Sequence, residues 1–517
     1  MCGAPAIPQS SAPSPSPASA SGIRRRVIAT SSCGDDGAND NEMATSIIAA
    51  ATTPNPILSK TMPSSATLLK PPKVSYSSGV AFYPPSDHHW RIGGKWYDFT
   101  DFLPLHPGGS EVLLLVRDRF EDATFVFESH HHNYKKTRAI IRKYEVDESV
   151  VRAAGLRSRP TNNSDCGRTK DDLLHHDRHL DANEIPKLLD DEAFYSILRR
   201  RVTQYLYRVG SPRGGPTMPC ILLFWTSFVA WLICYLWLLT TASISASICL
   251  GFTAAWLGAF GHNWVHQPKY KLWAHLSLDV VGFSSDAWFR EHNLQHHMYT
   301  NTPWDNHFRG SAPWLITDPT VKRNFLQQNV MPYINPILLS FGLYTNYLIN
   351  CVEVIKGNEI VSPWKLLLPF EIGAMAYNWG WRGMILMFLS HSILGVYYFT
   401  MALMNHNAHH CVNVTKRNAS RDWGEAQIVS SADWAVGMPF WAAGIFLWLN
   451  YHTVHHLFPL IDFSHHPAIQ EILIETCKEF RIDYVIASPL EIYIQMVHSF
   501  ASPASLMQEI LVYGGGI

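Results

Sequence analysis

Two long apolar segments near the middle of the chain constrain its fold more than any other feature. The stretch from Cys220 to Leu239 contains no charged residue and is about 20 residues long, the length with which an α-helix crosses the hydrocarbon core of a bilayer. A second apolar run, Ala242 to Phe260, follows with almost no loop between them. Because a backbone in lipid must satisfy its own hydrogen bonds, we expect a helical hairpin that leaves and returns to the same side.

A second hairpin is predicted further along the chain. Trp364 to Trp379 and Met384 to Met404 are apolar and flank the sequence Gly380-Trp381-Arg382-Gly383, which suits a tight turn. Met331 to Asn350 is also apolar but contains two prolines, so we expect an interfacial helix there. Pro439 to Leu449 is too short to cross and is expected to be re-entrant or interfacial. The predicted fold is an all-α membrane domain with about four transmembrane helices in two hairpins.

Three histidine clusters stand at or near the ends of these apolar segments. Their spacing of three and four residues puts the imidazoles of each cluster on one face of a helix. With four spans in two hairpins, all three clusters fall on one side of the membrane and can share one site. Stray polar histidines at helix ends are the alternative, but eight imidazoles are more than a core needs and suit a pair of metal ions. The clusters are His262 and His266, then His292, His296 and His297, and then His452, His455 and His456.

A separate pattern precedes the apolar part of the chain. His106-Pro107-Gly108-Gly109 follows the aromatic-rich stretch Trp90 to Phe99 and comes before a run of three histidines, His130 to His132. A haem with two imidazole ligands needs one histidine from each wall of an apolar slot, and a glycine turn lets the backbone approach the porphyrin. The pattern resembles cytochrome b5, which implies a small α+β domain that binds haem b. A surface turn beside a coincidental histidine run is the alternative.

The resemblance implies that His106 is one haem ligand, while the second is one of two neighbours. The spacing from His106 suggests His130, whereas the downstream residues Ile140 to Glu145 fit the end of the family better if the ligand is His131, which we prefer. Two protein ligands leave no open position for oxygen chemistry. The haem is therefore expected to relay electrons.

The three clusters have the forms HxxxH, HxxxHH and HxxHH, and they occur in this order around two predicted hairpins. In this they resemble the membrane fatty acid desaturases, from about Tyr195 to Pro489. The resemblance implies that the eight box histidines bind two non-haem iron ions. Imidazole alone does not select the metal, but a fused one-electron haem carrier favours iron and oxygen over a zinc hydrolase.

A fourth element follows the last predicted span. It reads Asn405-His406-Asn407-Ala408-His409, and its resemblance to desaturases of the stearoyl-CoA type implies that His409 is a ninth ligand, with Asn405 supporting the site. His406 and His410 are expected on other helix faces, in supporting or structural roles. Four further polar residues are candidates for orienting imidazole rings, with loop or cap roles as the alternative. They are Asp305, Asp433, Asn263 and Asn293.

The resemblance implies an O2-dependent fatty acyl desaturase. Electrons would pass from NAD(P)H through cytochrome b5 reductase to the chain's own haem, and then singly to the two irons. Two hydrogens would be removed from adjacent carbons of an acyl-CoA or acyl-lipid substrate, leaving a cis double bond and water. Fusion raises the effective concentration of the electron donor, so a separate cytochrome b5 is not required. The implied catalytic set is the eight box histidines with His409, and the implied haem ligands are His106 and His131.

Two positions depart from the pattern of the front-end desaturases, the group with a fused cytochrome b5 domain. His452 stands where that group usually has glutamine, and Asn263 stands where it usually has aspartate. The first box has three residues between its histidines, not the four that are common in stearoyl-CoA enzymes. The chain mixes features of both groups, so the double-bond position, the chain length and the acyl carrier stay open.

Composition excludes one class of partner and sets the predicted domain limits. The 517 residues carry a formal net charge of -1, so no basic excess is present to neutralise the phosphates of a nucleic acid. The Ser-, Ala- and Pro-rich start cannot bury enough apolar surface to order itself, and it is disordered, a targeting segment, or untranslated before Met43. We expect the endoplasmic reticulum membrane with both metal sites facing the cytosol, and a plastid membrane is the alternative. The predicted division is an N-terminal region at 1–75, a haem domain at 76–154, a linker at 155–194, a desaturase domain at 195–500 and a tail at 501–517.

Two other functions compete with desaturation. A lipid hydroxylase with a fused cytochrome b5 domain would insert oxygen where a desaturase removes the second hydrogen, although its histidine boxes tend to differ in number and order. A membrane-tethered haem electron carrier would have lost its second metal site, whereas all eight box histidines are present here. The mass change of the product separates the two enzymes, and the non-haem iron content identifies the carrier.

Overall fold

The computed structural model describes residues 88–119, 123–131, 134–154, 192–301, 305, 307, 312–318, 321–356, 359, 361–412 and 422–502. The predicted N-terminal region, nearly all of the predicted linker and the tail beyond residue 502 lie outside these residues. The predicted haem domain and the predicted membrane domain are both largely described.

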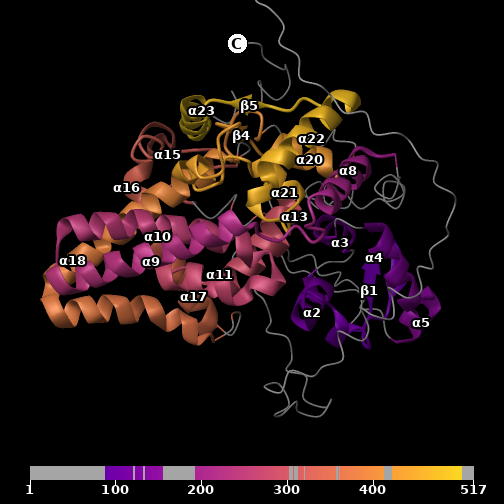
Figure 1. The fold of residues 1–517 in the computed structure, drawn as a ribbon, viewed down its shortest axis with the longest axis horizontal. Helices are drawn as coiled ribbons and strands as arrows, with labels where there is room; N and C mark the ends of the chain where they lie inside the picture. Colours follow the sequence, from indigo (N-terminus) through magenta and orange to yellow (C-terminus); the bar gives the residue numbers. More distant parts are fainter. Residues whose placement is uncertain are drawn as a thin grey trace, which may run out of the picture. The chain divides into compact units, whose positions relative to one another are not determined.

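The first described part is a small α+β domain around a three-stranded antiparallel sheet of order β1-β2-β3. β1 (Trp90–Ile92) and β2 (Lys95–Tyr97) form a hairpin, and β3 (Glu145–Val146) pairs with β2. Gly93 and Gly94 make the turn with φ of 62° and 72°, a backbone that glycine adopts without strain. The helices are η1 (Leu103–Leu105), α2 (Ser110–Arg119), α3 (Thr124–His130), α4 (Tyr134–Ile141), η2 (Arg142–Tyr144) and α5 (Glu148–Ala153), as Figure 1 shows.

Three helices in the described part of the chain are long and apolar enough to cross a membrane. α9 (Met218–Thr241) and α10 (Ile244–Val265) are joined by a sharp turn in which Ala242 has φ of 46°. The third is α18 (Leu367–Met404) with the short η7 (Pro363–Leu366) before it. α10 packs between α9 and α18, so its small residues are buried, while α9 exposes a row of large apolar side chains, as expected for a lipid-facing helix.

The count of three long helices differs from the predicted four because α18 contains both predicted segments of the second hairpin. Gly380 interrupts the helix with φ of 56° and ψ of -142°, a backbone that side-chain-bearing residues rarely adopt. A Cβ atom on Gly383 would collide with the backbone carbonyl of Met375, which a straight helix would keep two turns away. The chain therefore folds back at Gly380, where the sequence predicts a turn.

Neither of the two apolar segments outside the predicted hairpins forms a single continuous helix. Met331 to Asn350 is divided into α16 (Asn335–Leu339) and α17 (Gly342–Ile355), consistent with its prolines. Pro439 to Leu449 contains only the short η8 (Ala442–Phe446), and Leu447 and Trp448 follow it with positive φ. This irregular segment leads directly to the third histidine cluster.

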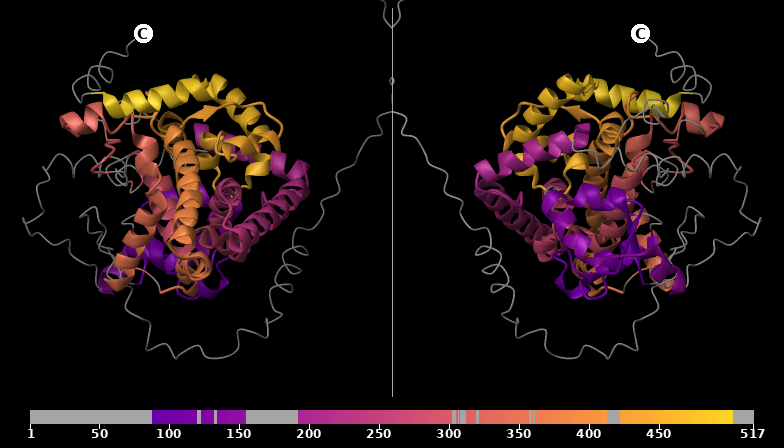
Figure 2. Two further views of the ribbon diagram at one scale, coloured as in Figure 1. Left: turned by 90° about the vertical axis from the view of Figure 1, so that its left-hand side faces the viewer. Right: turned by 90° about the vertical axis from the view of Figure 1, so that its right-hand side faces the viewer.

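The remaining helices gather near the end of α10 that carries its histidines, as Figure 1 shows, and Figure 2 shows the same ribbon from the two ends of its long axis. α8 (Phe194–Arg208) packs against α22 (His466–Phe480) and α20 (Trp423–Ser430). β4 (Asp433–Trp434) pairs in parallel with β5 (Ile486–Ala487) before α23 (Pro489–Ala501). The short helices α11 (Lys271–Leu278), η5 (Asp279–Val281), α12 (Ser285–Trp288), η6 (Phe289–His296), α13 (His297–Tyr299) and α21 (His452–Leu457) complete the surroundings of the histidines.

Candidate metal centre

The last turn of α10 carries His262, His266 directly follows the helix, and both side chains of this first cluster are buried. Gly261 precedes them, and a Cβ atom there would collide with the Leu278 side chain. The glycine therefore lets α11 pack closely on the end of α10. This packing encloses the histidines at a point where a spanning helix would otherwise end in water.

The second cluster lies on a π-helix, η6, and on the first residue of α13. A π-helix hydrogen-bonds residues five apart, so it brings side chains five apart onto one face, and such turns occur often at functional sites. His292 and His297 are five residues apart, and their Nε2 atoms lie 3.1 Å from each other. The local π geometry therefore points both rings to one place.

The third cluster lies on α21, directly after the irregular segment that ends near Trp448. Asp433 fixes the start of this helix, because its Oδ1 accepts a hydrogen bond of 2.6 Å from the backbone N–H of Thr453. His452, His455 and His456 are all buried.

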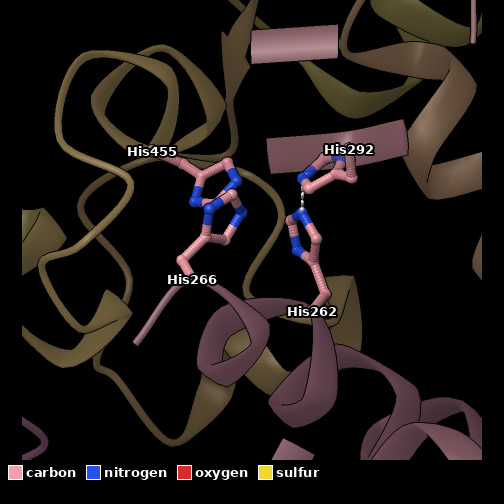
Figure 3. Close-up of side chains that lie close together, drawn as sticks. All are labelled: His262, His266, His292 and His455. Carbon is pink, nitrogen blue, oxygen red and sulfur yellow. Dashed lines mark hydrogen bonds between the residues drawn. The ribbon is translucent and has the colours of Figure 1, made fainter. Parts of the chain in front are cut away.

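Seven of the eight cluster histidines, together with His406, form two compact groups of four. In each group one ring nitrogen from every histidine lies within 4.8 Å of the others. Figure 3 shows the first group, in which His262 and His266 from α10 face His292 and His455. His297 lies against both groups, with ring centroids 4.8 Å from His455 and 4.2 Å from His456. The first histidine group is His262, His266, His292 and His455, and the second histidine group is His296, His406, His452 and His456.

The spacing of the ring nitrogens suits metal ions. Two nitrogens bound to one ion at about 2.0–2.1 Å are about 3 Å apart when they subtend a right angle. The Nε2 atoms of His262 and His292 are 2.7 Å apart. In the second group the Nε2 atom of His406 lies 3.1 Å from that of His296 and 2.9 Å from that of His452.

The protonation state and the unpaired atoms of these rings also fit metal binding. Burial lowers the pKa of His296 and of His406 to about 3, so both imidazoles are neutral near pH 7, which is the form that binds a metal. His266, His455 and His456 each have a buried Nε2 atom with no hydrogen-bond partner among the described residues. Buried polar atoms are rarely left unsatisfied, and bound ions would satisfy these.

Three contacts orient rings of the second histidine group from behind. His296 Nδ1 lies 2.8 Å from Asp305 Oδ2, and His456 Nδ1 lies 3.0 Å from Gln427 Oε1. His406 Nδ1 lies 3.0 Å from the carbonyl oxygen of Ser430. Each contact places the proton on Nδ1 and makes Nε2 the donor atom toward an ion, an arrangement typical of metal-bound histidine.

Of the four polar residues that the sequence suggested as partners of the imidazole rings, one contacts a ring and three have other partners. Asp305 contacts a cluster ring, as predicted for it. Asn263 instead donates to Asp462 Oδ2 at 2.7 Å, and Asn293 donates to the Val265 carbonyl at 3.0 Å, while Asp433 anchors α21. These three stabilise the backbone around the site and do not contact a cluster ring through these bonds. Sequence reasoning missed Gln427, whose role depends on contacts between residues far apart in the chain.

The structure places His406, and not the predicted His409, with the second histidine group. His409 Nε2 lies 2.9 Å from His498 Nδ1, away from the two groups. The prediction assumed that the helix continues through Asn405, but α18 ends at Met404 and the following residues form turns. The four-residue helical spacing therefore no longer applies. Asn405 accepts a hydrogen bond of 2.7 Å from Trp434 Nε1, which braces this turn.

His307 is a further imidazole that sequence reasoning did not select. Its ring stacks on His296 with centroids 4.5 Å apart, and its ring nitrogen falls within ligand range of His292 and His296. It follows Asp305 by two residues, and its backbone N–H donates to Asp305 Oδ1 at 2.9 Å. The signal available in the sequence was this proximity to an acidic residue just after the second cluster.

In the haem domain the structure brings together the rings of His106 and His131, with centroids 6.3 Å apart. His106 Nδ1 lies 3.1 Å from the Gly109 carbonyl and His131 Nδ1 lies 2.7 Å from the Phe127 carbonyl. Both contacts assign the proton to Nδ1 and leave Nε2 as the nitrogen suited to iron. A centroid separation of this size accommodates one iron with bonds of about 2 Å to each ring. A Cβ atom on Gly108 would lie 2.9 Å from the His106 ring, so glycine is needed for this close turn.

His130 has a different environment from His131. Its Nδ1 atom lies 3.0 Å from the Val126 carbonyl and 2.8 Å from Ser129 Oγ, and its Nε2 atom is buried. Burial lowers the pKa of His130 to about 4. Of the two neighbours, His131 is the one with a ring contact to His106.

Comparisons with known proteins give the families of two parts of the chain. Residues 236–487 match the fatty acid desaturase family, and residues 79–149 match the cytochrome b5-like haem/steroid binding domain. An acyl-lipid (8-3)-desaturase of Physcomitrium patens is 26% identical over 78% of this chain and 85% of its own length. A Delta(5) fatty acid desaturase A of Dictyostelium discoideum is 25% identical over 76% and 86%. An sn-1 linoleoyl-lipid 6-desaturase of Arthrospira platensis is 27% identical over 57% of this chain and 87% of its own.

Proposed function

Because this chain belongs to the fatty acid desaturase family and carries its own cytochrome b5-like domain, we propose that it introduces a cis double bond into an acyl chain carried on a lipid. The observation that supports this most is the pair of adjacent buried four-histidine groups. The names of two relatives, acyl-lipid and linoleoyl-lipid desaturases, favour a lipid-bound over a CoA-bound substrate.

Two non-haem iron ions bound at these groups supply the activation of O2 and the oxidation of the acyl chain. The residues around the ions bind them, orient the ligand rings and exclude water from the site. The first histidine group, the second histidine group and His297 bind the ions. Asp305, Gln427 and the Ser430 carbonyl keep the ring protons on Nδ1 and so present Nε2.

A small pocket beside the metal ligands suits one part of an acyl chain. Its lining combines the apolar residues Ala259, Leu447, Trp448 and Phe463 with the histidines His262 and His455. Methylene groups in such a pocket would lie against the ligands of the first histidine group, and the apolar residues would exclude water. Holding reactive carbons in place in this way is how an enzyme lowers the entropic part of the barrier.

The haem domain supplies electrons one at a time. His106 and His131, its predicted ligands, would hold the haem, which would supply one-electron transfer and no O2 chemistry. A cytochrome b5 reductase that uses NAD(P)H is the electron source that this arrangement requires. The domain limits that we propose are 76–154 for the haem domain and 195–500 for the desaturase domain.

The membrane topology that we propose has four crossings, with α18 crossing twice. Its first arm, from Pro363 to Trp379, is about 17 residues long, at the lower limit for a crossing, and its second arm is longer. With α9 and α10, this returns the chain to one side, where the two histidine groups lie. We propose the endoplasmic reticulum membrane, with these sites toward the cytosol.

Expression in yeast tests the function directly. Fatty acid methyl esters with localised double bonds are compared between cells with the wild-type chain and cells with His455→Ala. A new alkene that is absent from the variant supports the proposal and gives the position of the double bond. A product heavier by one oxygen identifies a hydroxylase. A chain with haem but no non-haem iron and no product, after feeding of polyunsaturated lipids, identifies an electron carrier.

A further inference from the structure

The haem domain and the membrane domain belong to the same unit of the structure, residues 71–517, and a buried ion pair joins them. Glu128 lies on α3 of the haem domain, and Arg199 lies on α8, which packs against the C-terminal helices. Their side chains are only 2% and 1% exposed. Arg199 donates to Glu128 Oε2 and also, at 3.1 Å, to the Glu128 carbonyl oxygen. We call this pair the interdomain latch.

The latch is better suited to positioning than to adding stability. A buried ion pair gains little over an apolar contact of the same size, because both charges lose their hydration. The pair nevertheless requires correct geometry, because a buried charge that loses its partner costs free energy of folding. Arg138, which also belongs to the haem domain, donates to Glu128 Oε1 at 2.7 Å. The other carboxylate oxygen, Oε2, accepts from Arg199. Both bonds come from the Nη1 atom of Arg199, and they hold α3 against α8 at this point.

On the membrane-domain side, α8 connects to the third histidine cluster. The Arg199 guanidinium lies over the Tyr195 ring, 4.5 Å from its centroid. Tyr195 donates its hydroxyl to the Leu457 carbonyl at 2.6 Å, and Leu457 directly follows His456. Tyr195 also donates its backbone N–H to Asp422 Oδ2, and Asp422 caps α20, the helix that carries Gln427. The position of Arg199 is thus tied to the ligands of the second histidine group.

On the haem side, the latch residue is three positions before His131. The next residue, Ser129, places its Oγ atom 3.7 Å from the sulfur of Met298. Met298 directly follows His297, which contacts both histidine groups. Ser129 and Met298 are both buried, so the contact lies in the protein interior. It connects the segment with the predicted haem ligand to the segment with a predicted iron ligand across one non-covalent step.

We propose that the interdomain latch between Glu128 and Arg199 positions α3 so that the Ser129–Met298 contact forms, and thereby sets the rate at which electrons pass from the haem to the histidine-bound metal centre of the same chain. This rests on the proposed function. Each transfer oxidises the haem iron from ferrous to ferric and reduces the metal centre by one electron, and the reductase then reduces the haem again. Arg199 and Glu128 are positioning residues, since neither contacts a histidine of the clusters.

The test uses the full-length holoenzyme in detergent or nanodiscs. The variants are Arg199→Met, which keeps an unbranched side chain without the charge, and Arg199→Lys, which keeps the charge without the fork geometry. The matched control is Lys95→Met, which breaks the exposed pair between Lys95 and Glu145 in the same haem domain. Haem is reduced by the reductase without oxygen, and its reoxidation is followed by stopped flow after mixing with oxygen and substrate. Hydrogen exchange of peptides from α3 and α8 is measured in parallel.

We expect Arg199→Met to keep the Soret band, the rate of haem reduction and the non-haem iron content, while haem reoxidation slows at least tenfold. Hydrogen exchange in α3 and α8 should become faster. Arg199→Lys should recover part of the reoxidation rate, and Lys95→Met should match the wild type. Wild-type reoxidation in Arg199→Met, or equal slowing in Lys95→Met, would overturn the proposal.

If Arg199→Met loses haem or iron, a second variant, Met298→Ala, tests the proposal. Met298→Ala removes the side chain that contacts Ser129 and leaves the latch intact. Slower haem reoxidation with retained cofactors supports a role for the Ser129–Met298 contact in electron transfer, and an unchanged rate of haem reoxidation rejects it. A wild-type chain that makes no alkene contradicts the proposed function, whereas normal alkene formation with unaffected latch variants contradicts the latch alone.

Discussion

The Nδ1 atom of His296 lies 2.8 Å from Oδ2 of Asp305, and both side chains are almost completely buried. The carboxylate also accepts the backbone N–H groups of Asn301 and His307, at 3.0 and 2.9 Å. These bonds immobilise the aspartate and, through it, the imidazole. One carboxylate thus orients a predicted iron ligand and shapes the turn that follows the second cluster.

Replacement of Asp305 by Asn should weaken metal binding without removing a ligand. An amide can present its NH2 group to Nδ1 and so favour the wrong tautomer of His296, and loss of such a partner typically costs 10- to 100-fold in metal affinity or activity. Iron per chain after dialysis against a chelator, together with alkene yield, measures the effect. Asp147→Asn, at the exposed N-cap of α5, is the control. Equal iron retention in both variants would refute this role for Asp305.

His406 and His409 should differ sharply when each is changed to Ala. His406 Nε2 lies 2.9 Å from His452 Nε2, whereas His409 contacts His498. We expect His406→Ala to lose non-haem iron and nearly all product, and His409→Ala to retain both. Metal analysis and product analysis on the same preparations decide this. The reverse pattern would restore the prediction made from the sequence.

The haem ligands can be assigned by absorption spectra. His131→Ala and His106→Ala should each lose the Soret band and keep non-haem iron, because the rings of these two residues lie together, with centroids 6.3 Å apart. His130→Ala should keep a six-coordinate haem spectrum. A chain that keeps its Soret band without His131 but loses it without His130 would reverse the assignment. Loss of haem and non-haem iron together would contradict the separation of the two sites.

Any side chain at Gly380 should lower the stability of the fold, although space is present around this residue. A Cβ atom there would meet nothing within 4 Å, so the cost is conformational and arises from φ of 56° with ψ of -142°. We expect Gly380→Ala to destabilise the fold by about 1–3 kcal/mol. The melting temperature in detergent reports this. Gly373→Ala is the control, because that glycine also meets nothing within 4 Å but lies within the helix, where Ala is favoured by about 1 kcal/mol.

Much of the site was predictable because its ligands repeat at helical spacing. His262 with His266, and His452 with His455 and His456, lie on short helical segments, so the distance along the chain determines which rings share a face. The second cluster followed the same logic only in part. The contact between His292 and His297 depends on a π-helix, and no simple sequence pattern distinguishes that turn from an α-helix.

By itself, the sequence determined the classes of the two sites and the apolar segments between them, because ligand type, ligand spacing and segment length are local properties of the chain. Only the tertiary structure decided that His406 lies with the second histidine group while His409 lies beside His498, that Asp305 and Gln427 contact cluster rings, and that Glu128 meets Arg199. These contacts join residues from 9 to 110 positions apart in the chain. Such distances are spanned by the packing of whole helices, and packing depends on all of their side chains at once.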